Sequence, residues 1–494
     1  MRAVKIVAGC LGGLALLLVA AAAFFLASFD ADKWKGELTR LVEKNMHRSL
    51  KIEGDLSVSL LPVPAVRLGK ATLSELRSEQ VFARIDGAGV ALQLMPLFAG
   101  QVVVNNVDID GLKVRLVRFS DGHLNIDDLL PKDANEPPAR FDIAGARLAN
   151  AELTWHDEQA GTELTLSALN LATGRLANAA SDRFELSATM AADKPRLAAT
   201  LQVSGEYRYD LAHGHFGAAQ LDARLAGDVA ALHGLDMTLA ATSVRFAAKA
   251  RAAGVEQLVL RAKGKEAGEA FEATLEVPKF AWAAGKASGS AASAALRQAG
   301  GQHSIEVKVG ISDIEGSGRV LKAGKLAIDL DLRRSETTVK GSLAAALSAD
   351  LESQTIEVPA FSGELVLAHP QLPMRRVALP LAGGLRADID GQTADLHADA
   401  RLDESRIAAR LHVARFSPLT LGFDLDIDQL NVDKYLLPKT AAAGARTPGE
   451  PLDFAALRGL NASGVVGIGQ LQASNVKAGK VRLEIKAGND RPSR

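Results

Sequence analysis

From Leu50 onward, hydrophobic and polar residues alternate along most of the chain. The clearest runs span residues 305–311 and 326–332, where aliphatic side chains occupy every second position, and residues 407–413 and 419–427 show the same alternation of hydrophobic and polar side chains. Successive side chains of a strand point to opposite faces, so this period of two predicts strands with one apolar and one polar face. Turn residues such as Gly300-Gly301 separate the runs. The pattern predicts a mainly β fold, a long curled antiparallel sheet of about 30 strands that forms an elongated arch or groove.

Before this pattern begins, residues 32–48 have apolar side chains at helical spacing. Trp34, Leu38 and Val42 lie on one side, and charged residues such as Arg40 and Lys44 lie around the other. This spacing predicts an amphipathic helix. It is compatible with a helix on a membrane surface, a helix that closes the end of the next domain, or an ordinary packing helix.

Residues 6–29 contain no charged side chain. As a helix they would span about 36 Å, enough to cross a hydrocarbon core about 30 Å thick. Arg2 and Lys5 precede the segment and favour a cytoplasmic N-terminus, which places the rest of the chain on the far side. The sequence therefore predicts a transmembrane anchor, represented by Ile6, Leu11, Leu16, Leu18, Phe24, Phe25 and Phe29.

Three other interpretations of this segment are weaker. A cleavable signal could end in the alanine run at 20–23, but Phe24, Phe25 and Leu26 prolong the apolar stretch beyond it. Cys10 lies in a sequence like a lipoprotein cleavage box, yet too few residues precede it to form a signal. A buried helix of a soluble core has no counterpart of similar length later in the chain.

Composition excludes several classes of function. The formal net charge is -1, so no global basic field favours nucleic acid. Cys10 is the single cysteine, which excludes internal disulfides and a thiolate metal site. Aromatic residues make up only 4 % of the chain, so few rings are available to stack on bases or sugars.

No set of residues suggests catalysis or a cofactor. His213 and His215 are the one close histidine pair, and a polar turn explains them better than a metal site does. Asp424, Asp426 and Asp428 share one sheet face, which is typical of a solvated surface. Because neither a nucleophile with its base nor a phosphate-binding loop is present, we expect no enzyme, no metal and no cofactor.

Changes in pattern divide the chain into segments. Two stretches with several prolines interrupt the alternation and are interpreted as linkers. The predicted segments are 1–29 (cytoplasmic end and anchor), 30–49 (amphipathic helix), 50–130 (N-terminal β domain), 131–139 (linker), 140–437 (repetitive antiparallel β region), 438–453 (linker) and 454–494 (a further β domain).

Two parts of the chain resemble the AsmA family, large envelope proteins of Gram-negative bacteria. The N-terminal match consists of residues 50–56, Ser59, Pro62, Val66, Leu68, residues 96–100, Val107, Asp110-Gly111, Val114, Leu116, Arg118, Asp121-Gly122, Asn125 and Leu129. The C-terminal match consists of residues 431–438, Gly464, Ile468-Gly469 and Leu471. Ile126 stands where the family often has tryptophan, and only Arg48 remains of the usual Thr-Gly-Arg. Family members normally continue with more strands, so residues 454–494 resemble the start of a truncated C-terminal domain.

This resemblance implies a long β arch in the periplasm, tethered to the inner membrane by a single pass. It also implies a role in outer-membrane assembly, a phospholipid ligand and an outer-membrane or other envelope protein as partner. From the residues themselves, a curled sheet must cover its apolar face with a second sheet, with helices or with a ligand. No helical pattern after Arg48 is extensive enough, so a sandwich and an acyl-chain groove both remain open.

The expected function is therefore to hold or transfer phospholipid along an apolar groove. The candidate lipid-facing residues are Val114, Leu116, Val307, Val309, Ile328, Leu330, Leu411, Leu421, Phe423 and Leu425. The alternative is a scaffold or assembly factor that carries no lipid and binds other envelope proteins through its strand edges.

Overall fold

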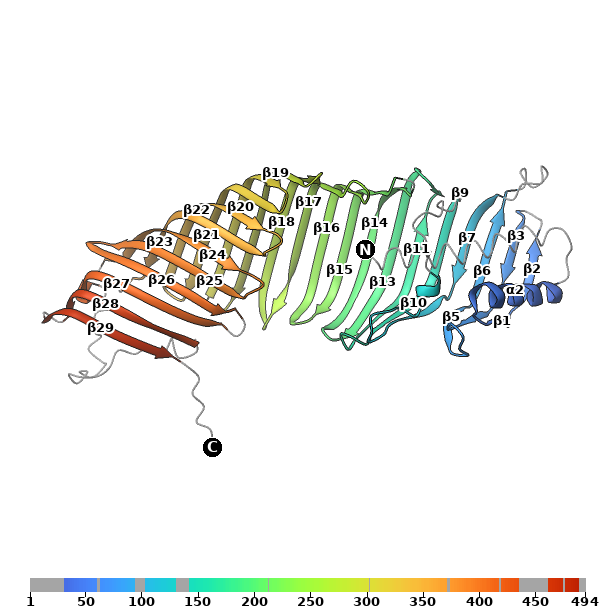
Figure 1. The fold of residues 1–494 in the computed structure, drawn as a ribbon, viewed down its shortest axis with the longest axis horizontal. Helices are drawn as coiled ribbons and strands as arrows, with labels where there is room; N and C mark the ends of the chain where they lie inside the picture. Colours follow the sequence, from blue (N-terminus) through green and yellow to red (C-terminus); the bar gives the residue numbers. More distant parts are fainter. Residues whose placement is uncertain are drawn as a thin grey trace, which may run out of the picture. The chain divides into compact units, whose positions relative to one another are not determined.

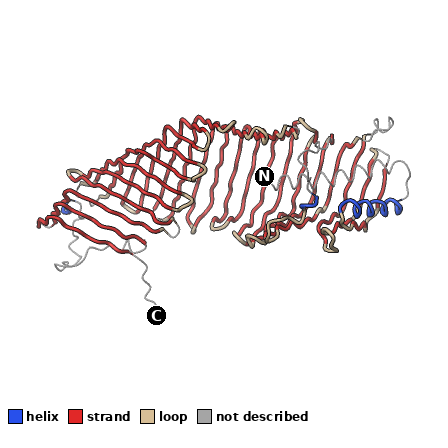
Figure 2. Tube along the Cα trace, viewed as in Figure 1, coloured by secondary structure: helices blue, strands red, loops and turns tan. Residues whose placement is uncertain are grey.

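The computed structural model describes residues 31–59, 63–93, 103–129, 142–211, 213–301, 303–370, 374–416, 419–434, 461–473 and 476–487. These residues form one α-helix and 29 β-strands, which confirms the prediction of a mainly β fold (Figure 2). The predicted anchor at 6–29 and both predicted linkers lie outside the described residues. Within the described part of the chain, no helix has the length and apolarity needed to span a membrane. The chain divides into two compact units, Met1–Ala267 and Gly268–Arg494.

The predicted amphipathic helix is present as α2 (Ala31–Met46). It ends because His47 adopts a left-handed backbone conformation (φ 55°) and donates its N–H to the carbonyl of Glu43 at 3.0 Å. Its apolar side faces the sheet, where Trp34 and Val42 are buried. The helix packs against the start of the first unit, as a helix that closes the end of a domain would (Figure 1).

The strands of the first unit meet in an unusual way at β10. One arm of four strands, β2-β3-β6-β7, pairs through β7 with the first half of β10. A second arm of four strands, β1-β4-β5-β8, pairs through β8 with the second half of β10. The sheet then continues in antiparallel order through β11, β13, β14, β15, β16 and β17, while β9 and β12 form a separate pair. The bounds are β1 (Leu50–Ile52), β2 (Leu56–Ser59), β3 (Ala65–Leu68), β4 (Ala71–Ser74), β5 (Val81–Ile85), β6 (Gly87–Leu92), β7 (Val104–Asp110), β8 (Lys113–Arg118), β9 (Asp142–Ile143), β10 (Gly145–Asp157), β11 (Thr162–Thr173), β12 (Leu176–Ala177), β13 (Ser181–Asp193), β14 (Arg196–Asp210), β15 (His215–Val229), β16 (Leu232–Ala247) and β17 (Ala252–Glu266).

Glycine and left-handed residues bend the chain between the two arms. A Cβ on Gly54 would lie 2.2 Å from the backbone nitrogen of Lys70, so only glycine permits this close approach. Gly111 (φ 62°) separates β7 from β8, and Asn150 (φ 52°) marks the irregularity of β10 at the same level. Residues of both arms share one core.

Two clusters of buried side chains close this end of the first unit. The first joins Trp34 of α2 to both arms and contains Leu56, Val66, Ala71, Ile85, Val90, Val107, Ile109 and Leu148, among others. The second contains Phe82, Leu116 and Ile126, and Ile126 reaches it from the segment that ends in the 3-10 helix η1 (Asp127–Leu129). Among the described residues, both such clusters lie between Trp34 and Leu176.

A buried arginine links the helix α2 to the strands and to η1. Arg48 follows α2 and is only 1 % exposed. Its guanidinium donates to both carboxylate oxygens of Asp128 at 2.7 and 2.8 Å, and to the carbonyls of Ser74 and Asn125 at 3.0 and 2.7 Å. The ring of Phe82 covers it, with 4.7 Å between the guanidinium carbon and the ring centre. Arg48 therefore links the end of α2, β4 and η1.

Glu75 lies next to this arginine and makes the stability of this end of the first unit depend on pH. Burial raises the pKa of Glu75 above its ordinary value of 4.5, against the opposing effects of a hydrogen bond from Asn125 (2.7 Å) and of Arg48 (3.6 Å). Because the pKa of Glu75 is higher in the folded protein than in the unfolded chain, its protonated form stabilises the folded protein at pH values below its ordinary pKa. This stabilisation is lost as the pH rises through the pKa of the folded protein. We expect Glu75→Gln to weaken this loss, measured as hydrogen exchange of β4 amides between pH 4 and 7. An unchanged pH profile in the variant would contradict this assignment.

The second unit contains β18 to β29. Consecutive strands pair antiparallel except at β27 and β28. The bounds are β18 (Glu269–Ala283), β19 (Lys286–Gly300), β20 (His303–Ser317), β21 (Val320–Arg334), β22 (Thr337–Asp350), β23 (Thr355–Ala368), β24 (Arg376–Asp388), β25 (Thr393–Leu402), β26 (Ser405–Arg415), β27 (Thr420–Asn431), β28 (Asn461–Ala473) and β29 (Val476–Ala487), with a 3-10 helix η2 (Val432–Lys434) after β27.

The prediction of an antiparallel sheet is wrong in two places. β10 runs parallel to β7 and β8, and β28 runs parallel to β27. Parallel neighbours cannot be joined by a tight hairpin, because the chain must first return to the end where it started. The segments that were predicted as linkers lie at these two connections, between η1 and β9 and between η2 and β28.

Candidate functional site

The candidate site is the apolar face of the sheet. In the second unit, the strand register aligns side chains into rows that cross all strands from β18 to β29. One row contains no charged or polar side chain. It consists of Leu275, Ala294, Val309, Ile328, Leu343, Gly363, Leu381, Ala400, Ile407, Ile427, Ile468 and Val481. With about 4.8 Å between neighbouring strands, the row runs for about 53 Å.

The opposite face of the same strands is charged. Lys308 and Asp329 stand opposite each other there, next to Val309 and Ile328 of the apolar row. Asp331 lies near Arg333 (3.0 Å) and Lys340 (3.5 Å), and Arg333 is the main reason why the pKa of Asp331 lies below its usual value. The two faces therefore differ sharply in polarity, as the period of two predicts.

The apolar face of the second unit is not sealed like the closed end of the first. Leu296, Leu365, Leu367 and Leu483 project from apolar rows and are 36 to 43 % exposed. Val309, Ile328 and Leu343 are half-buried. Side chains on neighbouring strands of the same sheet suffice to cover them to this extent. Side chains covered by a second layer would be buried, as those of the two clusters in the first unit are.

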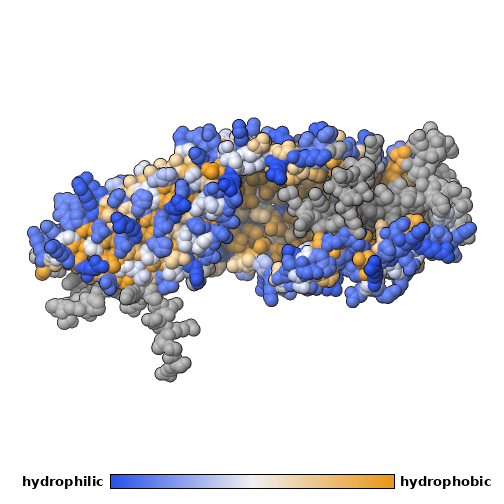
Figure 3. Space-filling view, in the orientation of Figure 1, coloured by the Kyte–Doolittle hydropathy of each residue, from blue (hydrophilic) through white to orange (hydrophobic). Residues whose placement is uncertain are grey.

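The first unit shows the change from a closed to an open face along one row. The row consists of Leu56, Leu68, Ala88, Ile109, Leu148, Leu171, Leu186, Val203, Ala223, Leu239 and Leu260. Its members up to Leu148 are mostly buried, and those from Leu171 onward are half-buried. The visible surface over β16 and β17 is hollowed and hydrophobic, with hydrophilic residues at both strand ends (Figure 3).

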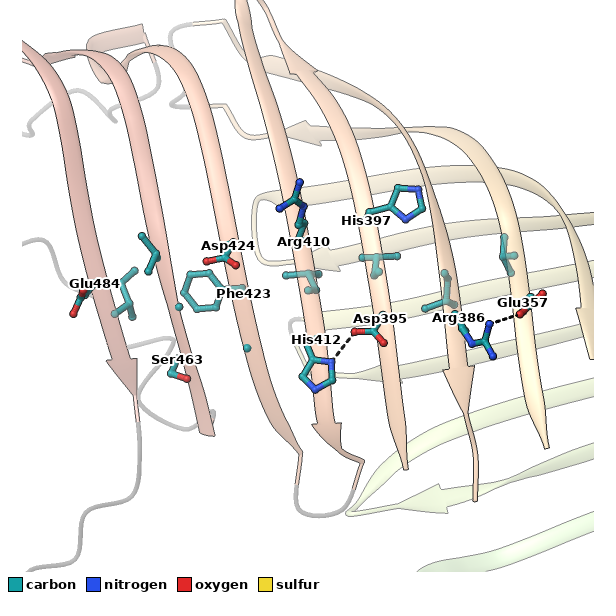
Figure 4. Close-up of a pocket in the computed structure, with 18 of the residues that line it drawn as sticks. Glu357, Arg386, Asp395, His397, Arg410, His412, Phe423, Asp424, Ser463 and Glu484 are labelled. Atoms are coloured by element: carbon teal, nitrogen blue, oxygen red, sulfur yellow. Dashed lines mark hydrogen bonds and ion pairs between the residues drawn. The ribbon is translucent and has the colours of Figure 1, made fainter. Parts of the chain in front are cut away.

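Two open pockets lie on β23 to β29, with volumes of about 750 and 1130 Å³. Each is lined by an apolar row and by the polar residues on either side of it. In the first pocket, the apolar row consists of Val358, Leu385, Leu396, Leu411, Phe423, Gly464 and Ile485 (Figure 4). A Cβ on Gly464 would lie 2.5 Å from Cγ of Phe423, so glycine leaves room for that ring.

Polar residues around the first pocket are paired across strands. Arg386 lies 2.8 Å from Glu357, and His412 lies 2.7 Å from Asp395 (Figure 4). All four side chains are exposed, which is typical of a solvated sheet face. They do not form a cluster suited to one ion, and no group of three or more metal-ligating side chains occurs in the described part of the chain.

The structure places the predicted lipid-facing residues in two different environments. Val307, Val309, Ile328, Leu330, Leu411, Leu421, Phe423 and Leu425 lie on the half-buried apolar face of the second unit. Val114 and Leu116 lie on the same kind of face in the first unit but pack in the closed cluster with Phe82 and Ile126. These two therefore belong to the closed end rather than to the open face. The predicted anchor residues lie outside the described residues.

Sequence analysis missed an aromatic cluster on the first unit. Phe184, Tyr207, Tyr209, Phe216 and Phe246 come from four neighbouring strands. A usable signal was present, because Tyr207 and Tyr209 are two of only three tyrosines in the chain and stand two residues apart on one strand face.

Comparison with known proteins identifies a family. A model described as the AsmA family matches residues 1–451. No curated protein and no solved structure matches the chain.

Proposed function

Because the chain belongs to the AsmA family, we propose that it supports outer-membrane assembly by holding or transferring phospholipid along the apolar face of its sheet. In this proposal residues 6–29 anchor the chain in the inner membrane by a single pass, and the strands lie in the periplasm. The protein needs no catalytic residue or cofactor for this role.

The observation that carries the proposal is the uncharged row of the second unit together with its exposure. Each acyl methylene that leaves water for such a surface contributes about 0.8 kcal/mol. A row of about 53 Å, from Leu275 to Val481, offers this contact without interruption by a charge. Large exposed apolar surfaces mark sites that bind a protein partner, a membrane or a ligand.

The test compares the two opposite faces of the same strands in the full chain. Ile328 and Leu343 are direct partners on the apolar face, and Ala327 and Ala344 are direct partners on the exposed polar face. We expect I328D combined with L343D to lower the amount of co-purifying phospholipid about tenfold or more, because the lipid would have to bury two carboxylates. The matched control, A327D combined with A344D, adds the same two opposed charges and should retain the lipid.

Photocrosslinking gives a second readout. A photoreactive residue at Ile328 or Leu330 should capture phospholipid, and one at Asp329 should not, because Asp329 points to the opposite face. Absence of phospholipid from the purified protein, together with no capture at Ile328 and Leu330, would refute the proposal.

A scaffold that binds envelope proteins is the second candidate. It is favoured by β29, which among the described strands pairs with β28 alone and exposes 67 % of Val476. The edge of such a strand can accept a strand from another chain. In that case crosslinks from β29 would capture protein, and the aspartate pair on the apolar face would have no effect on the complex.

A further inference from the structure

Five aromatic rings gather near one end of the strands of the first unit. Tyr209, Phe216 and Phe246 are direct neighbours across β14, β15 and β16. Tyr207 lies between Tyr209 and Phe184, with ring centres 6.1 and 6.3 Å away. Phe216 is 39 % exposed although it belongs to an apolar cluster. Such a ring offers a large apolar contact to a ligand.

This aromatic cluster lies where the closed end of the first unit gives way to the open face. Tyr207 donates its hydroxyl hydrogen to the carbonyl of Arg175 at 2.7 Å. Arg175 precedes Leu176, which packs against the first buried cluster, and its guanidinium donates to both carboxylate oxygens of Asp142 at 2.6 and 2.8 Å. On the other side, Val203 of the same strand belongs to the half-buried apolar row.

β14 leads from the apolar row to polar groups at its end. β14 passes from Val203 through the two tyrosines to Asp210. Burial raises the pKa of both Tyr207 and Tyr209 to about 12. Tyrosines with an apolar ring and a polar tip are the residues that proteins place at the level of lipid headgroups and esters.

Two basic residues lie beyond the rings. The turn after β16 carries Lys249 and Arg251, and it lies beside the turn after β14, because Ala248 donates its N–H to the carbonyl of Gly214 at 2.8 Å. His213 in the neighbouring turn is paired with Asp210 at 2.7 Å. Both charged side chains of the turn at 248–251 are basic, which is the sign of charge that attracts a phosphate group.

We propose that the aromatic cluster and the turn at 248–251 hold the interfacial part of a glycerophospholipid, with the phosphate toward Lys249 and Arg251. The glycerol and ester groups lie against Tyr207, Tyr209 and Phe216, and the acyl chains continue over Val203 and Leu239. This assignment rests on the proposed function and adds an orientation and an anchoring position for the lipid next to the closed end.

The experiment uses the full chain with phosphatidylethanolamine that carries a photoreactive diazirine either on the headgroup or at the end of an acyl chain. Crosslinked peptides are identified by mass spectrometry. We expect the headgroup probe to label residues 207–216 and 246–251, and the acyl probe to label peptides with Val203 or Leu239. Headgroup labelling at the opposite ends of the strands, or identical labelling by both probes, would overturn the orientation.

Charge variants test the phosphate contact. K249Q combined with R251Q should lower headgroup labelling about fivefold, the loss expected from two exposed ion pairs. R261Q combined with K265Q removes the same charge from the other part of β17 and should leave labelling unchanged. Equal labelling of both variants would refute the phosphate contact.

The outcomes separate this inference from the proposed function. Acyl labelling of β20 to β22 without headgroup labelling at the aromatic cluster would refute the anchoring position and leave the lipid groove intact. Absence of labelling by both probes on either unit would refute the lipid groove itself. Each result is distinct because Ile328 and Leu330 lie on the second unit, and the aromatic cluster lies on the first.

Discussion

Arg48→Ala is expected to destabilise the closed end of the first unit by about 3–5 kcal/mol, the usual cost of removing one partner of a buried ion pair. The variant would leave the carboxylate of Asp128 without its two charged donors, and the carbonyls of Ser74 and Asn125 without theirs. It would also leave a void beside Phe82. The loss should appear as faster hydrogen exchange in α2, β1 and β4, which reports the free energy of local opening.

Two further variants define the reason for this effect. Arg48→Lys keeps the charge but cannot make the two parallel hydrogen bonds to Asp128, so it should recover only part of the stability. Arg40→Ala removes an exposed arginine of α2 that lies 3.0 Å from Glu37, and should cost less than about 1 kcal/mol. If Arg48→Ala and Arg40→Ala had the same effect, Arg48 would not fasten this end of the unit.

Ile126→Ala is expected to cost about 2–5 kcal/mol, whereas Ile328→Ala should cost only about 1 kcal/mol. Both changes delete the same atoms, but Ile126 is 1 % exposed in a sealed cluster and Ile328 lies on a half-buried face. Removal of a sealed side chain leaves a cavity, and removal of a half-exposed one does not. Local hydrogen exchange around η1 and in β20 to β22 would measure the two costs.

This comparison bears directly on function. If Ile328→Ala cost as much as Ile126→Ala, a second layer of protein would cover the apolar face of the second unit, and no path for an acyl chain would remain. A small cost at Ile328 together with a large cost at Ile126 would agree with one closed and one open region.

The strongly alternating segments of the sequence predicted their strands correctly. Residues 305–311, 326–332 and 407–413 lie in β20, β21 and β26. β19 had no comparable signal, because Leu296 is its one large aliphatic residue among alanine, glycine and serine. It forms a strand because β18 and β20 pair with it on both sides. Pairing with the neighbouring strands therefore stabilises β19 as a strand, although the strand propensity of its own residues is low.

The candidate site was predictable to the same extent. Alternation identified the apolar side chains of the second unit, such as Val309 and Ile328, since a strand fixes which residues share a face. Alternation could not distinguish Leu116, which Ile126 helps to bury, from Leu330, which remains half-buried. That difference depends on segments far apart in sequence, and no local pattern records it.

The sequence by itself determined that this chain is mainly β, with one apolar and one charged face per strand, because side-chain alternation follows from strand geometry alone. It also determined the helix before Leu50 and the resemblance to the AsmA family. Tertiary structure alone decided the register that joins twelve strands into one uncharged row, the parallel joins at β10 and β28, and the gathering of five rings beside the closed end. These features depend on which strands become neighbours, and hydrogen bonds between distant segments settle that choice.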